Sequence, residues 1–133
     1  MAIEGLTTLK SEFSPEDTVA RLEAAAQAKG LTVFARIDHA AGASAVGMPL
    51  RPTVLVIFGN ARGGTPLMQA RQSAGIDLPL KALVWLDEAG ATWLSYNEPA
   101  WLAARHGIGP QAGATLQALT GTLATLARSA TRP

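Results

Sequence analysis

The sequence predicts an α+β fold: a two-layer α/β sandwich with a mainly antiparallel sheet of about five strands and helices layered on one face. Three observations predict it. The run TVLVIFG (53–59) is continuously apolar, as in a central strand. The segments 78–87 and 91–96 are strand-like and flank the turn DEAG, which is typical of a hairpin. Helical segments stand between and after the strands, and the hairpin breaks the alternation of a dinucleotide-binding chain.

The first elements follow from local signals. Residues 5–13 mix Thr, Leu and Phe and are expected to form a strand. Ser14 can cap a helix that begins at Pro15 and ends near Gly30, where a left-handed residue is needed. Residues 31–38 alternate between two faces, which is strand behaviour. The small residues of 39–48 indicate a loop or a short helical excursion.

The later elements complete the order β-α-β-β-α-β-β-α-α. Thr65 and Pro66 predict a helix start, with its end at Gly75. Asn97 is expected to cap a short helix that ends at Gly107. A last helix, over about 110–129, carries an apolar stripe that must be buried on its own sheet or on a partner's helix. The stripe consists of Leu116, Leu119, Leu123 and Leu126.

Composition limits the class of protein. The 133 residues are expected to form one domain, 1–133, and the net charge of +1 argues against a nucleic-acid-binding protein. The absence of cysteine excludes disulfides and fits a reducing cytoplasm. No signal peptide or membrane-spanning run is evident. The two histidines have no carboxylate partner at a short spacing, so neither a metal nor a cofactor is predicted.

The stretch FGNARGGTPLM (58–68) joins a strand to a helix through three glycines. Such a turn can bind an anion with the free amides of the helix, here at Thr65 with help from Arg62. It can also be only a tight bend, because the glycines match neither the dinucleotide fingerprint nor the P-loop. Asn60 suits a left-handed turn or offers an amide to a ligand.

Other chemistry is sparse. His39 stands at a strand end, where it either makes a structural hydrogen bond or contacts a ligand. Lys81 and Trp85 share one strand face, which is either exposed or the wall of a cavity for a small polar ligand. His106 suits the terminal carbonyls of a helix. Ser44, Ser73 and Ser95 are not in a nucleophile elbow, so serine-hydrolase chemistry is not predicted.

Several segments resemble a family of bacterial and archaeal proteins, the domain of unknown function 302. The segments are IDHAAGA (37–43), LRPTVLVIFGN (50–60), GTPLMQA (64–70), GIDLPLKALVW (75–85) and WLSYNEP (93–99). The resemblance covers roughly residues 5–107 and leaves the last helix outside. It implies a compact fold with a curved sheet backed by helices, and a homodimer. No biochemical activity is established for the family, so the resemblance implies no reaction.

The family's characteristic residues fall on His39, Pro52, Phe58, Gly59, Asn60, Gly64, Thr65, Leu78, Pro79, Lys81 and Trp85. Two positions depart from the pattern. Ala61 stands where a proline commonly follows Phe-Gly-Asn in the family. Leu86 stands where an acidic residue commonly follows the tryptophan, and its absence weakens any acid–base role for that position. The cis or trans state of Leu78–Pro79 is left open.

Three functions remain as hypotheses. The first is a cytoplasmic homodimer that binds a small polar or anionic ligand near the turn 58–65, through His39, Asn60, Thr65, Lys81 and Trp85. His39, the turn 58–60, Thr65 and Lys81 are expected to converge at one end of the sheet. The second is an enzyme with His39 as general acid/base and Lys81 as electrostatic stabiliser. The third is a structural module whose leucine stripe forms the dimer.

Overall fold

The computed structural model describes residues 2–133. Its sheet is antiparallel throughout, with five strands in the order β1-β5-β4-β3-β2. The strands are β1 (Leu6–Ser11), β2 (Thr32–Asp38), β3 (Thr53–Gly59), β4 (Leu80–Leu86) and β5 (Thr92–Asn97). The helices are α1 (Pro15–Ala28), α2 (His39–Ala45), α3 (Ala61–Ala70), α4 (Pro99–Arg105) and α5 (Gly113–Thr131), with the 3-10 helices η1 (Gln72–Asp77) and η2 (Pro110–Ala112). The predicted α+β class is confirmed.

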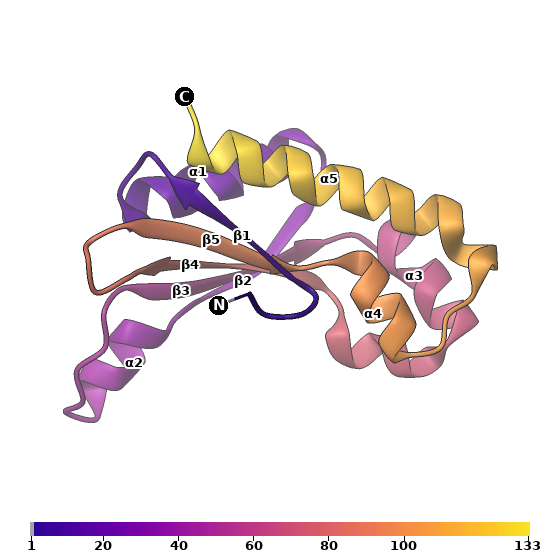
Figure 1. The fold of residues 1–133 in the computed structure, drawn as a ribbon, viewed down its shortest axis with the longest axis horizontal. Coiled ribbons are helices and arrows are strands. Elements are labelled where there is room, and N and C mark those ends of the chain that lie inside the picture. Colours follow the sequence, from indigo (N-terminus) through magenta and orange to yellow (C-terminus); the bar gives the residue numbers. More distant parts are fainter. Residues whose placement is uncertain (1) are drawn as a thin grey trace.

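The hydrophobic core lies between the sheet and the two long helices α1 and α5, which run side by side over one sheet face (Figure 1). Alternate residues of the central strands point into it. Val56, Phe58, Val84 and Leu94 are fully buried, and each such side chain contributes roughly 1.5–3 kcal/mol. This layer holds β3 and β4 in fixed register and so fixes the position of the turn that follows β3.

The leucine stripe of α5 belongs to this core. Leu119, Leu123 and Leu126 are buried, and Leu116 packs against the same cluster. The stripe therefore faces the chain's own sheet and neighbouring helices. The hypothesis that these leucines form a dimer surface is wrong.

Helix starts follow capping side chains. The Ser14 hydroxyl accepts a hydrogen bond from the Asp17 amide at 3.1 Å, as expected. Asp38 caps α2 in the same way, through the amide of Ala41 at 2.9 Å. Residues 39–45 are therefore helical, which is the short helical excursion left open by the sequence.

Two predicted helix starts are wrong. The helix expected to start at Thr65 and Pro66 begins at Ala61, because Asn60 accepts from the Gly63 amide at 2.7 Å and caps the helix five residues before Thr65. Pro66 thus lies inside α3, and α3 ends at Ala70, before Gly75. Asn97 does not cap α4, because it still pairs with β1; the N-cap is Glu98.

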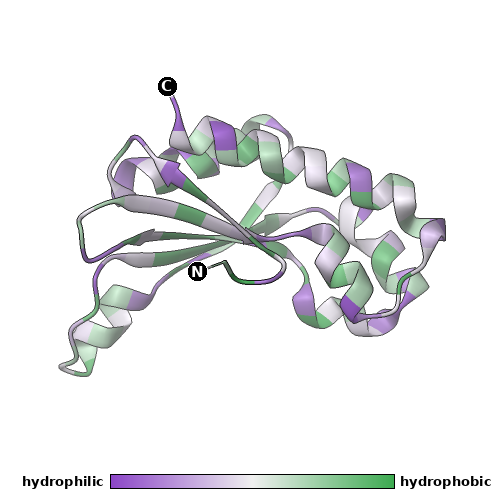
Figure 2. Cartoon of the chain, viewed as in Figure 1, coloured by the Kyte–Doolittle hydropathy of each residue, from purple (hydrophilic) through white to green (hydrophobic). Residues whose placement is uncertain are grey.

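The second sheet face carries neither α1 nor α5 (Figure 1). We call it the open face, and its central side chains are Leu55, Ile57, Leu83 and Trp85. Residues 39–50, here called the arm, project from the β2–β3 end away from α1 and α5. The arm has no charged residue and is mostly green and pale in Figure 2, with Val46, Met48 and Leu50 exposed.

None of the described helices is long and apolar enough to cross a bilayer.

Candidate functional site

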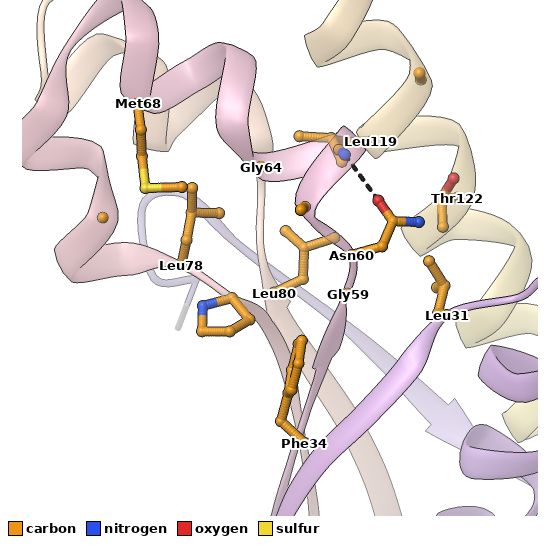
Figure 3. A pocket seen from close by; sticks show the side chains of 15 residues that line it. Leu31, Phe34, Gly59, Asn60, Gly64, Met68, Leu78, Leu80, Leu119 and Thr122 are labelled. Atoms are coloured by element: carbon orange, nitrogen blue, oxygen red, sulfur yellow. Dashed lines mark hydrogen bonds between the residues drawn. The ribbon is translucent and has the colours of Figure 1, made fainter.

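A cavity of about 380 Å³ lies where β3 ends and β4 begins, with α3 and α5 on its other sides. Its walls are largely apolar. They include Phe34, Met68, Leu78, Pro79, Leu80 and Leu119 (Figure 3). The cavity therefore adjoins the glycine-rich turn that the sequence singled out. We call it the turn pocket.

Glycines make room for the turn pocket. Gly59, Gly63, Gly64 and Gly75 all line it. A Cβ atom on Gly64 would stand 3.5 Å from Leu78 Cδ1, in ordinary contact, and would narrow the space. Gly59 has φ +152°, a conformation that L side chains rarely adopt, so it also serves the bend out of β3. The glycine-rich turn is thus a tight bend whose backbone forms one wall of the turn pocket.

Two polar side chains face the turn pocket. Asn60 turns its carboxamide nitrogen to the side where Thr122 of α5 lies (Figure 3). The hydrogen bond from Gly63 occupies Asn60 Oδ1 and so fixes the orientation of the amide. Within residues 2–133, neither Asn60 Nδ2 nor the Thr122 hydroxyl has a protein hydrogen-bond partner. Both groups can therefore serve a ligand.

The structure does not bring the five predicted site residues together. Asn60 lines the turn pocket, whereas His39, Thr65, Lys81 and Trp85 do not. β2 and β3 run antiparallel with Thr32 opposite Gly59 and Asp38 opposite Val54. His39 therefore follows the strand at the far end from Asn60, where it is exposed at the start of α2. The expectation that these side chains converge at one end of the sheet is wrong.

Lys81 and Trp85 lie on the open face, because Lys81 pairs with Ile57 and both point away from the buried Phe58. They line a shallow hollow with Leu55, Leu83 and Asn97. Lys81 Nζ donates to the Asp77 carbonyl at 3.2 Å. Burial lowers the pKa of Lys81 because it disfavours the ammonium, and the negative charge of Asp77 opposes this shift.

The tryptophans of the hairpin form a stack with satisfied N–H groups. Trp85 and Trp93 have centroids 6.2 Å apart, at 27°. Trp85 Nε1 donates to Ser95 Oγ at 3.0 Å, and Trp93 Nε1 donates to Asp87 Oδ2 at 2.8 Å. This bond from Trp93, followed by backbone bonds, lowers the pKa of Asp87. Trp85 is thus held in place as part of the open face.

Comparison with known proteins identifies the family to which this chain belongs. The family model "Domain of unknown function DUF302" matches residues 7–126, which is most of the chain. The chain belongs to the DUF302 family. The match extends beyond residue 107 into α5, which the sequence resemblance had left outside.

The DUF302 fold is seen in a crystal structure of an uncharacterised conserved protein from Bacillus stearothermophilus. That chain matches with a TM-score of 0.86 and 18% identity, covering 98% of this chain and 100% of that one. At this identity the likeness shows the fold alone. It confirms that the five-stranded sheet and its helices form the DUF302 architecture.

Curated relatives bear another name. Proteins called "Fluoride-specific ion channel FluC" from Brucella suis and Brucella abortus are each 47% identical over 119 residues, or 89% of this chain. The match covers 47% and 44% of their lengths. This DUF302 chain thus spans less than half of the curated relatives it matches.

The DUF302 chain also has a polar cluster that the sequence analysis missed. His106 Nε2 lies 2.5 Å from Asp77 Oδ2, and His106 Nδ1 lies 2.8 Å from the Ser73 hydroxyl. Arg105 donates to both Asp77 oxygens at 2.9 and 3.0 Å. An imidazole protonated on Nε2 satisfies both of its bonds. The residues come from η1 and α4, far apart in sequence, so no local spacing could reveal the cluster.

This Ser–His–Asp arrangement is chemically a proton relay, but neither Ser73 nor His106 lines the turn pocket. The His106 side chain is 7% exposed and that of Asp77 is 15% exposed. The largely buried Asp77 carboxylate accepts hydrogen bonds from His106 and Arg105, and these bonds connect η1 to the end of α4. We therefore assign the cluster to holding η1 against α4. His106 thus has a structural role, but its ring bonds the side chains of Ser73 and Asp77, in place of the terminal helix carbonyls that the sequence predicted.

Proposed function

We propose that this DUF302 chain is a cytoplasmic domain that binds a small molecule in the turn pocket. The observation that carries the proposal is a cavity of about 380 Å³ with mostly apolar walls and two available polar groups. Ligand sites are typically concave, apolar and of roughly 300–1,000 Å³, with few polar groups that fix orientation. No charged side chain lines the pocket, which gives the anionic ligand considered from the sequence no counter-charge.

A thermal-shift screen against a metabolite library tests the proposal. A ligand at about 100 times its dissociation constant stabilises the fold by roughly 2.7 kcal/mol, which raises the melting temperature by several degrees. Ala118→Phe places a ring from α5 at the pocket, whereas Gln117→Phe adds the same ring at an exposed neighbouring position. We expect hits that survive in Gln117→Phe and vanish in Ala118→Phe. Hits unaffected by Ala118→Phe would place binding elsewhere and refute the proposal.

The proposal does not extend to catalysis by His39. That side chain is exposed at the start of α2, and the turn pocket lies at the opposite end of β3. Lys81, the supposed electrostatic stabiliser, points to the open face. The geometry thus gives the enzyme hypothesis no common site.

We propose further that a second copy of this chain covers the open face. Five strands about 4.8 Å apart and about 20 Å long give this twisted face a projected area of about 480 Å². This is over half of the ~800 Å² per partner in a standard interface, and the uncharged arm enlarges it. The exposed side chains Val46, Met48 and Leu50 of the arm would then be buried by the partner.

Light scattering after size exclusion tests this dimer. We expect a dimer for the wild type and a monomer for Leu83→Glu, because a carboxylate in the centre of the open face would be buried unpaired. Gln117→Glu, on the exposed side of α5, is the matched control and stays dimeric. A wild-type monomer at tens of micromolar would contradict the proposal.

A second function follows from the Brucella relatives: we propose that the chain acts with a fluoride channel as an accessory domain. The support is 47% identity to a segment that makes up under half of each channel protein. The turn pocket has no cation to hold fluoride, so the role would be a protein contact.

A chimera tests this second function. The similar segment of the Brucella suis channel is replaced by this chain, and fluoride efflux is measured in proteoliposomes. We expect efflux to persist in the chimera and to fall when the grafted chain carries Leu83→Glu. Efflux that is unchanged after deletion of the whole segment would contradict an accessory role in transport.

A further inference from the structure

We propose that the ligand of the turn pocket is an uncharged amphipathic molecule, with an apolar body and one hydrogen-bond-accepting group that lies between Asn60 and Thr122. This inference rests on the proposed binding function and names the chemical class. If each non-hydrogen atom takes the ~30 Å³ that a water molecule occupies in the liquid, a cavity of about 380 Å³ holds roughly a dozen such atoms. The class includes medium-chain ketones, esters and amides.

The walls exclude a charged body. None of the 15 lining residues has a charged side chain. Asn60 is exposed, but an ion among the apolar side chains of the pocket would lose hydration with no compensating charge, which is far more costly than moving a neutral group. The apolar side chains Phe34, Leu78 and Leu119 favour hydrocarbon, and the flexible thioether of Met68 adapts to its shape.

The polar groups select an acceptor. Asn60 uses one lone pair of Oδ1 to cap α3, and this bond leaves its Nδ2 donor free and directed to the ligand. The Thr122 hydroxyl rotates and can donate as well. A carbonyl oxygen has two lone pairs and can accept from both groups. An ammonium group has only hydrogen-bond donors, so it could not form a hydrogen bond with the Asn60 Nδ2 donor.

Three probes with the same nine-carbon chain test the class by isothermal titration calorimetry: nonan-2-one, nonanoate and nonylammonium. We expect nonan-2-one to bind at least about tenfold more tightly than either ion, equivalent to about 1.4 kcal/mol. The Ala118→Phe variant should lose this binding, and Gln117→Phe should keep it.

Asn60→Asp provides a sharper test. It retains a capping oxygen for the Gly63 amide and replaces the Nδ2 donor by a negatively charged acceptor oxygen. Asp is as good an N-cap as Asn, and its charge suits a helix N-terminus, so the fold is expected to persist. We expect nonan-2-one to bind at least about tenfold more weakly and nonylammonium to gain affinity. Thr122→Val, which removes the second donor at similar volume, should weaken the ketone alone.

The outcomes separate the two proposals. Equal affinity for all three probes, unaffected by Asn60→Asp, would overturn the assigned class while binding in the turn pocket stands. Tighter binding of nonylammonium by the wild type would also overturn it. If no probe binds but the library screen yields hits sensitive to Ala118→Phe, the class is wrong and the binding function survives. If neither yields binding, both proposals fail.

Discussion

The imidazole of His106 lies 2.5 Å from the carboxylate of Asp77 and joins the end of α4 to η1. Both side chains are largely buried, and Arg105 and Ser73 complete the hydrogen bonds around them. Because η1 leads directly to Leu78 and Pro79, this contact anchors one wall of the turn pocket.

His106→Ala should destabilise the protein by about 1–3 kcal/mol, because it removes a hydrogen bond to the charged carboxylate of Asp77, which keeps only its bonds from Arg105. The melting temperature should fall by several degrees. Ser73→Ala, at an exposed position, should cost less. Calorimetry of both variants checks the prediction. Equal losses would contradict the assignment of the main contact to Asp77.

Asp87 is expected to contribute an acid-sensitive part of the stability. Hydrogen bonds from Trp93 Nε1 and from backbone amides hold its folded pKa below the unfolded value of about 3.9. The contribution is therefore complete above the unfolded pKa and is lost as pH falls through the folded pKa. Trp93→Phe, which removes the main donor, should raise the Asp87 pKa. NMR titration of the Asp87 carboxyl in both proteins measures it; an unchanged pKa would contradict this cause.

The sheet could be predicted because its signals are local. The apolar run of β3 predicts a central strand with buried side chains, which the structure confirms. The alternation of residues 31–38 predicts a strand, but a register shift between Val33 and Ala35 breaks it, so Val33 pairs with buried Phe58 whereas Ile37 is exposed. The hairpin of β4 and β5 also follows from its turn. The start of α3 was missed because Gly63 and Gly64 are poor helix formers, which concealed Asn60 as the cap.

The candidate site was only partly predictable. Asn60 was selected because its turn is unusual, and it does line the pocket. His39 was misplaced because strand direction depends on pairing across the sheet, which one sequence does not specify. Thr122 had no signal at all, since a threonine within a long helix looks like any solvent-facing residue. The Asp77–His106 contact joins positions 29 apart and needs the packed fold.

Two glycine substitutions should have opposite effects on stability. Gly64 lies within α3, and a Cβ there would make ordinary contacts with Leu78 and Met68 at 3.5 and 3.9 Å. Gly64→Ala should therefore stabilise the fold by roughly 0.5–1 kcal/mol. Gly30 has φ +76° with no heavy atom within 4 Å of a new Cβ, so Gly30→Ala should cost about 1–2 kcal/mol through the backbone alone. Denaturant unfolding of both variants measures the difference. A loss of stability in Gly64→Ala would show that α3 cannot accept the added methyl group.

Lys81→Met should raise stability at neutral pH, by less than about 1 kcal/mol because the side chain keeps partial contact with solvent. Burial lowers the folded pKa of Lys81, so the unfolded chain binds more protons between that pKa and the unfolded value of about 10.4. The cost of the charged lysine is complete below the folded pKa. It diminishes as pH rises through this window. The advantage of Lys81→Met over the wild type should therefore shrink at alkaline pH, as measured by urea unfolding at a series of pH values. An advantage that grows with pH would mean that the ammonium is stabilised, with its bond to the Asp77 carbonyl outweighing burial.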